Sequence, residues 1–196
     1  QALSAVAALS AGALIFSDPP SALPLERLSL LRTLLPPLPR AAVAADLLQR
    51  EIPCQLITPL CGRDAAGGDD TATLGQWWLL GLFNWSGAEA PAGGGAAGEE
   101  LPLLPLLAIS TASASGRSSA GPSLDPAVAT AVGWHAFEFW SGTYRRLPGG
   151  LLATLLPPCV PPRCSWLLAL RPVLGENAQI VGTDVHASCG LEVVLW

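Results

Sequence analysis

From residue 46 onward the chain is a series of short apolar runs separated by segments rich in glycine and proline. The 20 glycines and 19 prolines among 196 residues favour turns and short strands over long helices. The number of runs, about eight, is typical of an antiparallel β-sandwich or barrel. They cover residues 54–60, 75–85, 103–110, 134–140, 151–155, 165–170, 179–182 and 190–196. We therefore expect residues 46–196 to form a C-terminal antiparallel β-sandwich.

Composition excludes several classes of protein. Hydrophobic residues make up 51% and charged residues 13% of the chain, which is too apolar for a disordered protein. The ten basic residues are all arginines and are scattered along a chain of net charge −5, so nucleic-acid binding is not expected. No segment reaches the roughly 20 consecutive apolar residues of a membrane helix, so we expect no membrane insertion. The absence of methionine suggests a processed chain or a piece of a longer one.

The N-terminal segment has a different pattern, which predicts a helix, a strand and a second helix. Residues 1–11 are rich in Ala and Leu without proline, as expected for the end of a helix. Ala13–Phe16 is a continuous apolar run, typical of a parallel strand buried on both faces. Leucines then recur at i, i+3 and i+4 spacing from Pro24 to Pro36, with Ser21 as a possible upstream cap. One such unit cannot form a parallel sheet alone, so its partner strands are expected upstream.

Histidines and cysteines give little support for a metal site. His135 and His186 lie 51 positions apart without a third local ligand, and we favour hydrogen-bonding roles for both. Cys159 and Cys164 lack the second pair that a zinc site needs, and we expect them to be buried apolar residues. The five cysteines are an odd set without a tight repeat, so no disulfide framework is implied. We expect no metal, no cofactor and a reducing, cytoplasmic setting.

Acidic residues provide one candidate for substrate binding. Asp18 follows the predicted strand Ala13–Phe16, and in a (β/α) barrel that end of a strand faces the active site. The alternative, which we favour, is a turn-forming aspartate before Pro19. Glu138 lies within an aromatic strand, where a cross-strand partner or a solvent-facing position is expected. No serine lies in a Gly-x-Ser-x-Gly elbow, so the residues give little support for nucleophilic catalysis.

The seven tryptophans suggest two alternatives. Indole faces can stack on sugar rings, but most of these residues are expected to pack in a core. Trp77 and Trp78 are adjacent, so in a strand they point to opposite faces. In residues 134–140, odd-numbered and even-numbered side chains are likewise expected on opposite faces. The triplet Asn84-Trp85-Ser86 fits the N-glycosylation pattern, which would matter only in a secretory setting.

Several segments, in order, resemble the C-terminal part of α-galactosidase-like enzymes of glycoside hydrolase family 36 and its clan. Residues 7–18, 25–28 and 34–38 resemble the last stretch of the catalytic barrel. The segments Leu82-Phe83-Asn84-Trp85-Ser86, residues 135–142 and residues 168–172 resemble strands of the family's C-terminal sandwich. Residues 180–186 with Gly190 complete the order.

The resemblance implies that residues 1–45 are the incomplete end of a catalytic (β/α)8 barrel and that residues 46–196 are the sandwich. It also implies a retaining glycosidase that uses two aspartates, both upstream of the part resembled here. The chain alone would then be inactive, with the missing barrel as its partner. Alternatives are a module that binds oligosaccharide, a purely structural sandwich, or the product of a decayed gene.

Overall fold

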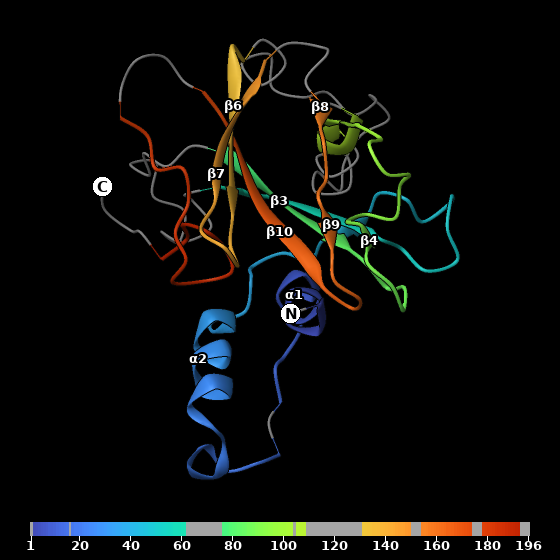
Figure 1. Cartoon of the computed structure of the whole chain (residues 1–196). Coiled ribbons are helices and arrows are strands. Elements are labelled where there is room, and N and C mark those ends of the chain that lie inside the picture. Colours follow the sequence, from blue (N-terminus) through green and yellow to red (C-terminus); the bar gives the residue numbers. More distant parts are fainter. Residues whose placement is uncertain are drawn as a thin grey trace, which may run out of the picture.

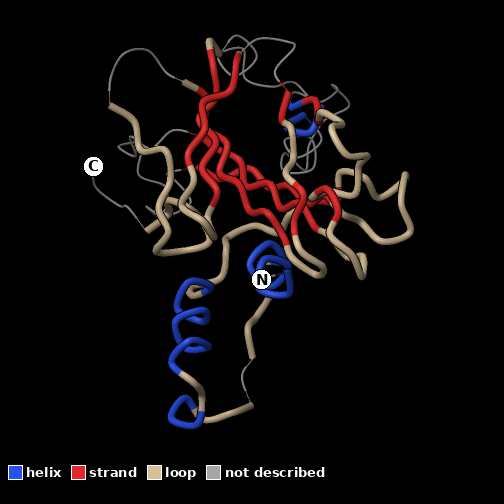
Figure 2. Tube along the Cα trace, in the orientation of Figure 1, coloured by secondary structure: helices blue, strands red, loops and turns tan. Residues whose placement is uncertain are grey.

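The computed structural model describes residues 2–15, 17–61, 76–103, 105–108, 131–149, 154–173 and 178–192. The protein is mainly β, with one large antiparallel sheet and few helices (Figures 1 and 2). This agrees with the expected class and is consistent with a sandwich. The sheet has the order β1 (Val43–Ala44), β2 (Gln55–Cys61), β3 (Gln76–Phe83), β10 (Ser165–Pro172), β6 (Gly133–Glu138) and β7 (Tyr144–Pro148).

Smaller elements complete the described fold. Two ribbons of two strands each are formed by β4 (Ala90–Pro91) with β9 (Cys159–Val160), and by β5 (Leu101–Pro102) with β8 (Thr154–Leu155). The helices are α1 (Ala2–Ser10), the 3-10 turn η1 (Pro20–Ala22) and α2 (Leu25–Leu34), and residues 105–108 are also helical. Within the described parts of the chain, no helix has the length and apolar character needed to cross a bilayer.

The central strands β3 and β10 are buried on both faces. They pair in antiparallel register from Ser165 opposite Phe83 to Leu170 opposite Trp78. Trp77 and Trp78 point to opposite faces, as expected, yet neither has any exposed surface. The long apolar runs of these two strands require a cover on each side of the sheet, because burying apolar surface is the main favourable term in folding.

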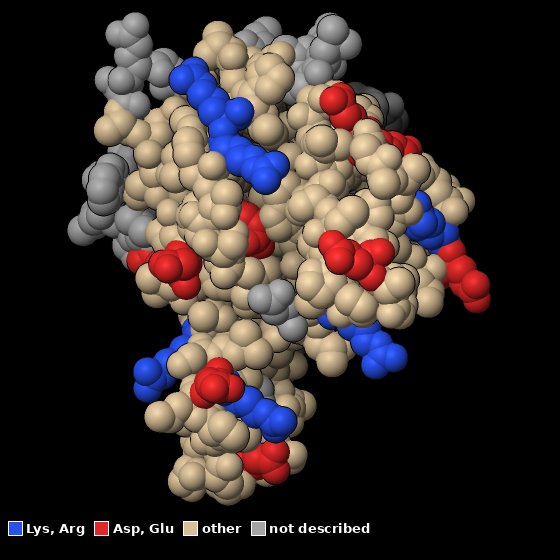
Figure 3. Space-filling model, in the orientation of Figure 1, with Lys and Arg blue, Asp and Glu red and all other residues tan. Residues whose placement is uncertain are grey.

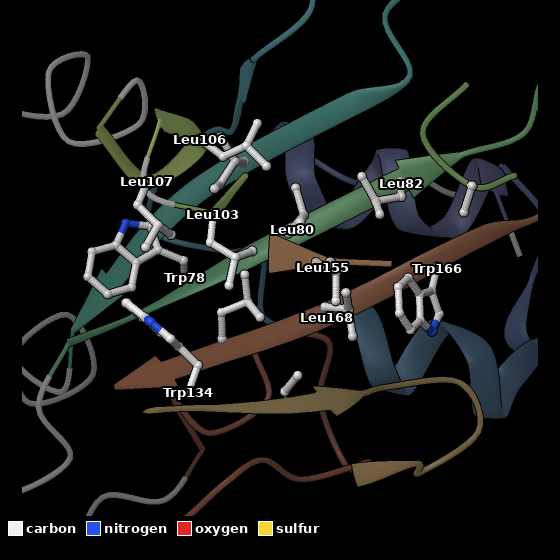
Figure 4. Packing of buried hydrophobic residues seen from close by; sticks show 14 of the residues in the cluster. Trp78, Leu80, Leu82, Leu103, Leu106, Leu107, Trp134, Leu155, Trp166 and Leu168 are labelled. Atoms are coloured by element: carbon white, nitrogen blue, oxygen red, sulfur yellow. The ribbon is translucent and has the colours of Figure 1, made fainter. Parts of the chain in front are cut away.

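One face, which we call the ribbon face, is covered by the two short ribbons and the helical residues 105–108. Figure 4 shows Leu103, Leu106 and Leu107 packed above Trp78 of β3. Trp134 of β6 meets Trp78 edge to face, with ring centroids 5.9 Å apart. This geometry is favourable for aromatic pairs and makes the ribbon face a continuous apolar core.

The opposite face, which we call the helix face, is covered by α1, by the end of α2 and by residues 178–192, the C-terminal loop. The inner side of α1 is small, with Ala2, Ala5 and Ala8 buried beside Leu9. Gly81 of β3 makes this close approach possible, because a Cβ at this position would overlap the end of the Leu9 side chain. The backbone N–H of Ala42 also donates to the Leu9 carbonyl at 2.8 Å.

The predicted strand at Ala13–Phe16 is not formed. Residues 13–15 have no regular structure, and Ile15 is 89% exposed, while Phe16 lies outside the described residues. A strand needs hydrogen-bonding neighbours, and none of the described strands lies beside this segment. The two flanking helices are confirmed as α1 and α2. The residue before α2 is Pro24, and Ser21 does not cap this helix because it lies within η1.

Other sequence predictions are confirmed in part. Five predicted runs overlap β2, β3, β6, β8 and β10, namely residues 54–60, 75–85, 134–140, 151–155 and 165–170. The strand predicted at residues 103–110 is wrong, because residues 105–108 are helical. A short apolar run is compatible with either a strand or a helix. Residues 179–182 and 190–192 belong to the C-terminal loop, while residues 193–196 lie outside the described residues.

Adding one methyl group at Gly81 should weaken the attachment of α1. The Gly81→Ala side chain would overlap Leu9 and crowd the Phe83 ring, so the free energy of unfolding should fall by about 1–3 kcal/mol in urea titrations. Gly87→Ala is the matched control, because nothing lies within 4 Å of a Cβ there. Equal stability of the two variants would contradict the close packing.

Candidate functional site

Asp18, the predicted substrate-binding candidate, is exposed and lies in a bend just before η1. It lines an open pocket of about 370 Å³ together with Ile15, Leu23 and Arg27. The other described side chains around the pocket are leucines and a serine, so no second carboxylate faces Asp18. The bend agrees with the turn-forming role that we favoured, and the geometry supplies no acid pair for hydrolysis.

The two histidines lie at separate places, and each forms hydrogen bonds as predicted. His135 on β6 has Nδ1 2.9 Å from the Tyr144 hydroxyl and Nε2 3.4 Å from Gln179 Oε1. His186 lies in the C-terminal loop and is 6% exposed. In the described part of the chain, His, Cys, Asp and Glu form no group that could hold a metal ion.

A cluster of hydrogen-bonded polar groups surrounds His186. Its Nε2 lies 2.8 Å from the carbonyl oxygen of Pro36, which is 150 residues away in sequence. A carbonyl oxygen only accepts, so Nε2 carries a hydrogen and Nδ1 accepts from the Ser188 N–H at 3.1 Å. His186 thereby fastens the C-terminal loop to the segment that follows α2. We call His186, Ser188 and Glu192 together the loop anchor.

Glu192 closes the loop on itself. Its Oε2 accepts hydrogen bonds from the Ser188 hydroxyl at 2.9 Å and from the Gly190 N–H at 3.1 Å. The Thr183 hydroxyl donates to its other carboxylate oxygen. Three donors from one short segment hold the carboxylate, so the loop has a defined shape without belonging to the sheet.

Arg171 on β10 supports the loop from below. Its side chain is 3% exposed, and its guanidinium lies 4.0 Å from the centre of the Trp77 ring. Nη2 donates to the Cys189 carbonyl at 3.0 Å, and Trp77 Nε1 donates to the Ser188 carbonyl at 3.0 Å. Burial lowers the pKa of Arg171 to about 10, so the guanidinium is still protonated at neutral pH.

Two glycines let the loop approach the sheet. Gly190 has φ +145° and lies so close to Arg171 that a Cβ would overlap Nη2. Gly182 lies against the Phe137 ring of β6 in the same manner. Both residues belong to the segment that resembles family 36, and in this structure each has a packing role.

Asn84 organises the turn after β3. It is 3% exposed, and its Nδ2 lies 2.9 Å from the carbonyl oxygens of Ala88 and Val160. Its Oδ1 accepts from the N–H and hydroxyl of Ser86. Because the amide nitrogen is buried and hydrogen-bonded, the folded protein does not present the Asn84 sequon to a glycosylating enzyme.

Glu138 is buried and has a hydrogen-bond partner on the neighbouring strand β10. It is 3% exposed, lies opposite Leu168 of β10, and its Oε2 accepts from the Ser141 N–H at 2.6 Å. Its Oε1 accepts from the Leu167 N–H at 3.3 Å. The solvent-facing alternative is therefore wrong and the cross-strand partner is confirmed, because β10 and the turn after β6 both bring backbone donors to the buried carboxylate. The Ser-Gly-Thr turn that follows the strand was the available signal.

The cysteines differ in environment. Cys54 and Cys189 are buried, Cys164 is half-buried and Cys159 is exposed, so the expectation of a buried residue is wrong for Cys159. All four are free thiols. Burial raises the pKa of Cys189 well above its ordinary value, and burial together with the nearby Asp46 carboxylate raises the pKa of Cys54.

The six described tryptophans do not form an exposed platform. Trp77, Trp78, Trp134 and Trp166 are buried, and the other two are half-buried. Of these two, Trp85 stacks on Phe83 with centroids 4.9 Å apart and donates to the Pro53 carbonyl. The expectation that most tryptophans pack in a core is confirmed.

Comparison with known proteins finds no matching family model, no similar curated protein and no similar solved structure. The functional interpretation therefore depends on the geometry and on the sequence resemblance. The geometry shows that the C-terminal loop joins the segment around the end of α2 to the sheet.

Removing the His186 ring should weaken that joint. His186→Ala leaves the Pro36 carbonyl and the Ser188 N–H without their partner and should lower the free energy of unfolding by about 1–3 kcal/mol. The matched control is His135→Ala, whose ring is half-buried and bonds close to the surface, so its effect should be smaller. A larger loss of unfolding free energy in His135→Ala than in His186→Ala would show that the hydrogen bonds of His186 contribute less to stability than those of His135.

The cysteines should separate clearly in a labelling experiment. Iodoacetamide at pH 8 should modify exposed Cys159 in the native protein, whereas Cys189 should react only after unfolding in urea. The reason is that Cys189 is fully buried and its raised pKa keeps it in the unreactive thiol form. Peptide mass spectrometry identifies the labelled residue, and Cys159→Ser should remove the fast phase. Native labelling of Cys189 at the rate of Cys159 would contradict this burial.

Proposed function

We propose that this chain is the C-terminal portion of a retaining α-galactosidase-like glycoside hydrolase of the family 36 type. In that protein, residues 1–45, apart from the sheet strand β1 (Val43–Ala44), would complete a catalytic (β/α)8 barrel, and residues 46–196 would be the C-terminal sandwich. The role of the chain itself would be structural. Hydrolysis of the O-glycosidic bond would use two aspartates of the upstream barrel, one as nucleophile and one as general acid and base.

The observation that carries this proposal is the incomplete cover of the N-terminal helices. In Figures 1 and 2, α2 and the segment before it project away from the sheet. Leu34 is the one buried residue of α2, while Leu25 is 81% exposed. A ten-residue helix is marginal in water unless its apolar face is packed. The exposed Leu25 and the half-buried Leu28 and Leu31 therefore fit a helix whose second neighbour belongs to another part of the protein.

The segment before α2 supports the same conclusion. Ile15 belongs to the apolar run that resembles a barrel strand, and it is 89% exposed. Leu3, on the outer side of α1, is 81% exposed. Single exposed apolar residues are common, but these occur in a segment whose pattern matches burial on both faces. A barrel that supplied the neighbouring strands would cover Leu3, Ile15 and Leu25.

The resembling segments in the sheet support a structural role for the sandwich. Asn84, Arg171, Gly182, His186 and Gly190 are all occupied with packing or with hydrogen bonds inside the chain. None of them lines a shared cleft with two carboxylates. The residues that carry the resemblance thus hold the domain together and fix its loop against the N-terminal helices.

A module that binds extended oligosaccharides is the second candidate, and the burial of the tryptophans counts against it. We also propose a cytoplasmic location. The four described cysteines are free, and the Asn84 amide is buried, both of which suit a compartment without disulfide formation or glycosylation.

An activity assay tests the structural role. The purified chain should show no turnover of p-nitrophenyl α-galactoside above a blank, because the acid pair would lie in the barrel. An Asp18→Ala variant serves as control for the predicted substrate-rim residue. Turnover by this chain that is abolished by a substitution within it would overturn the proposal.

Replacing the exposed apolar residues tests the missing neighbour. The double variant Ile15→Ser/Leu25→Ser should raise the monomeric fraction in light scattering several-fold, and its unfolding free energy should stay within about 0.5 kcal/mol of the parent. Leu48→Ser/Val132→Ser is the matched control, since these side chains are 98% and 75% exposed outside the N-terminal helices. An equal gain from both double variants would argue against a specific docking face.

A further inference from the structure

We propose that the pocket between the turn after β6 and the segment before β9 binds a small, neutral, polyhydroxylated molecule the size of one sugar ring. The pocket has a volume of about 190 Å³. Its polar lining comes from Glu138, Ser141, Thr143 and Arg145, and Trp166 forms part of its apolar lining. No role in the proposed function uses these residues.

Strand register brings the polar groups to one place. Arg145 of β7 lies opposite Ala136 of β6, so both side chains share the ribbon face of the sheet. Glu138 follows Ala136 on the same face, and it pairs with Leu168 of β10. Figure 3 shows arginines over β7 beside a hollow in the surface. The short ribbons leave this corner of the ribbon face open.

The two charges of the pocket are held apart. Glu138 is 3% exposed and is held by two backbone N–H groups. Arg145 is exposed, and its guanidinium lies 5.8 Å from the centre of the Trp166 ring. The described part of the chain contains no ion pair between Arg145 and Glu138 within 4.0 Å. A carboxylate and a guanidinium therefore line one small space without neutralising each other directly.

This arrangement selects for hydroxyl groups. A hydroxyl can donate to the remaining lone pairs of Glu138 and accept from Arg145 at the same time. The Thr143 hydroxyl accepts from Ser141 Oγ at 2.8 Å and can still donate its own hydrogen to a ligand. An anion could satisfy only Arg145 and a cation only Glu138, because each would be repelled by the other charged group. A neutral molecule with neighbouring hydroxyls satisfies both groups.

The size and apolar lining limit the ligand further. Pockets for drug-sized ligands typically have about 300–1,000 Å³, so this pocket accommodates a single ring or a short polyol. Apolar side chains of β6 and β10 line its other walls and can contact the C–H face of a ring. With few contacts, the expected dissociation constant is on the order of 1–10 mM.

The test is a titration of the full chain with D-galactose, D-glucose and glycerol, followed by ligand-observed NMR and by tryptophan fluorescence. At least one of the three should bind saturably with a dissociation constant on the order of 1–10 mM. Arg145→Ala should weaken that binding at least tenfold. Arg146→Ala is the matched control, because this neighbouring arginine is also exposed but lies opposite His135. Circular dichroism verifies that both variants are folded.

Three outcomes would overturn the proposal. The first is that none of the three probes binds saturably at concentrations up to about 100 mM. The second is that the Arg145→Ala and Arg146→Ala variants bind the probe equally well. The third is that acetate binds saturably and that this binding depends on Arg145. The result is independent of the proposed hydrolase relationship, since the pocket is built by β6, β7 and β10. Loss of this binding would leave the activity and solubility tests unaffected.

Discussion

The burial of β3 and β10 on both faces is the constraint on which the described structure depends. Both strands are almost uniformly apolar, so neither side of the sheet can face water without a large loss of hydrophobic stabilisation. Antiparallel sheets often leave one face solvated, but here each face has its own cover. The ribbon face is covered by segments that lie between the strands in sequence. The helix face is covered by α1, by the end of α2 and by the C-terminal loop, which come from opposite parts of the chain.

Covering a sheet with a loop differs physically from covering it with a helix. A loop has backbone groups that no regular structure satisfies, and buried polar groups must find partners. In the C-terminal loop those partners are Trp77, Arg171 and the carboxylate of Glu192. His186 adds the bond to Pro36, which joins the loop to the N-terminal helices. The sheet positions Trp77 and Arg171, which bond to the loop, and the loop in turn holds the segment after α2 through His186.

The sequence predicts what long apolar runs and helical periodicity can determine. The central strands, the alternation on β6 and both N-terminal helices follow from these patterns. The two-residue strands β1, β4, β5 and β9 could not be predicted, because their pairing depends on segments far away in sequence, whereas β8 lies in a predicted run. The polar, exposed strand β7 carries no apolar signal, and the helical residues 105–108 have the same composition as a buried strand. At the site, hydrogen bonding by His186 could be predicted, whereas the burial of Glu138 depends on turn geometry.

The N-terminal segment has two different contact faces, and this difference is central to its interpretation. The inner side of α1 and Leu34 pack on the sheet and account for the stability that the segment gains here. The outer apolar residues Leu3, Ile15 and Leu25 add nothing to that contact, because they face solvent. A segment needed only to cover the sheet would gain solubility from polar residues at these three positions. Their apolar character is accounted for if the segment lies between the sheet and a second apolar surface, which is the position that the end of a barrel would occupy.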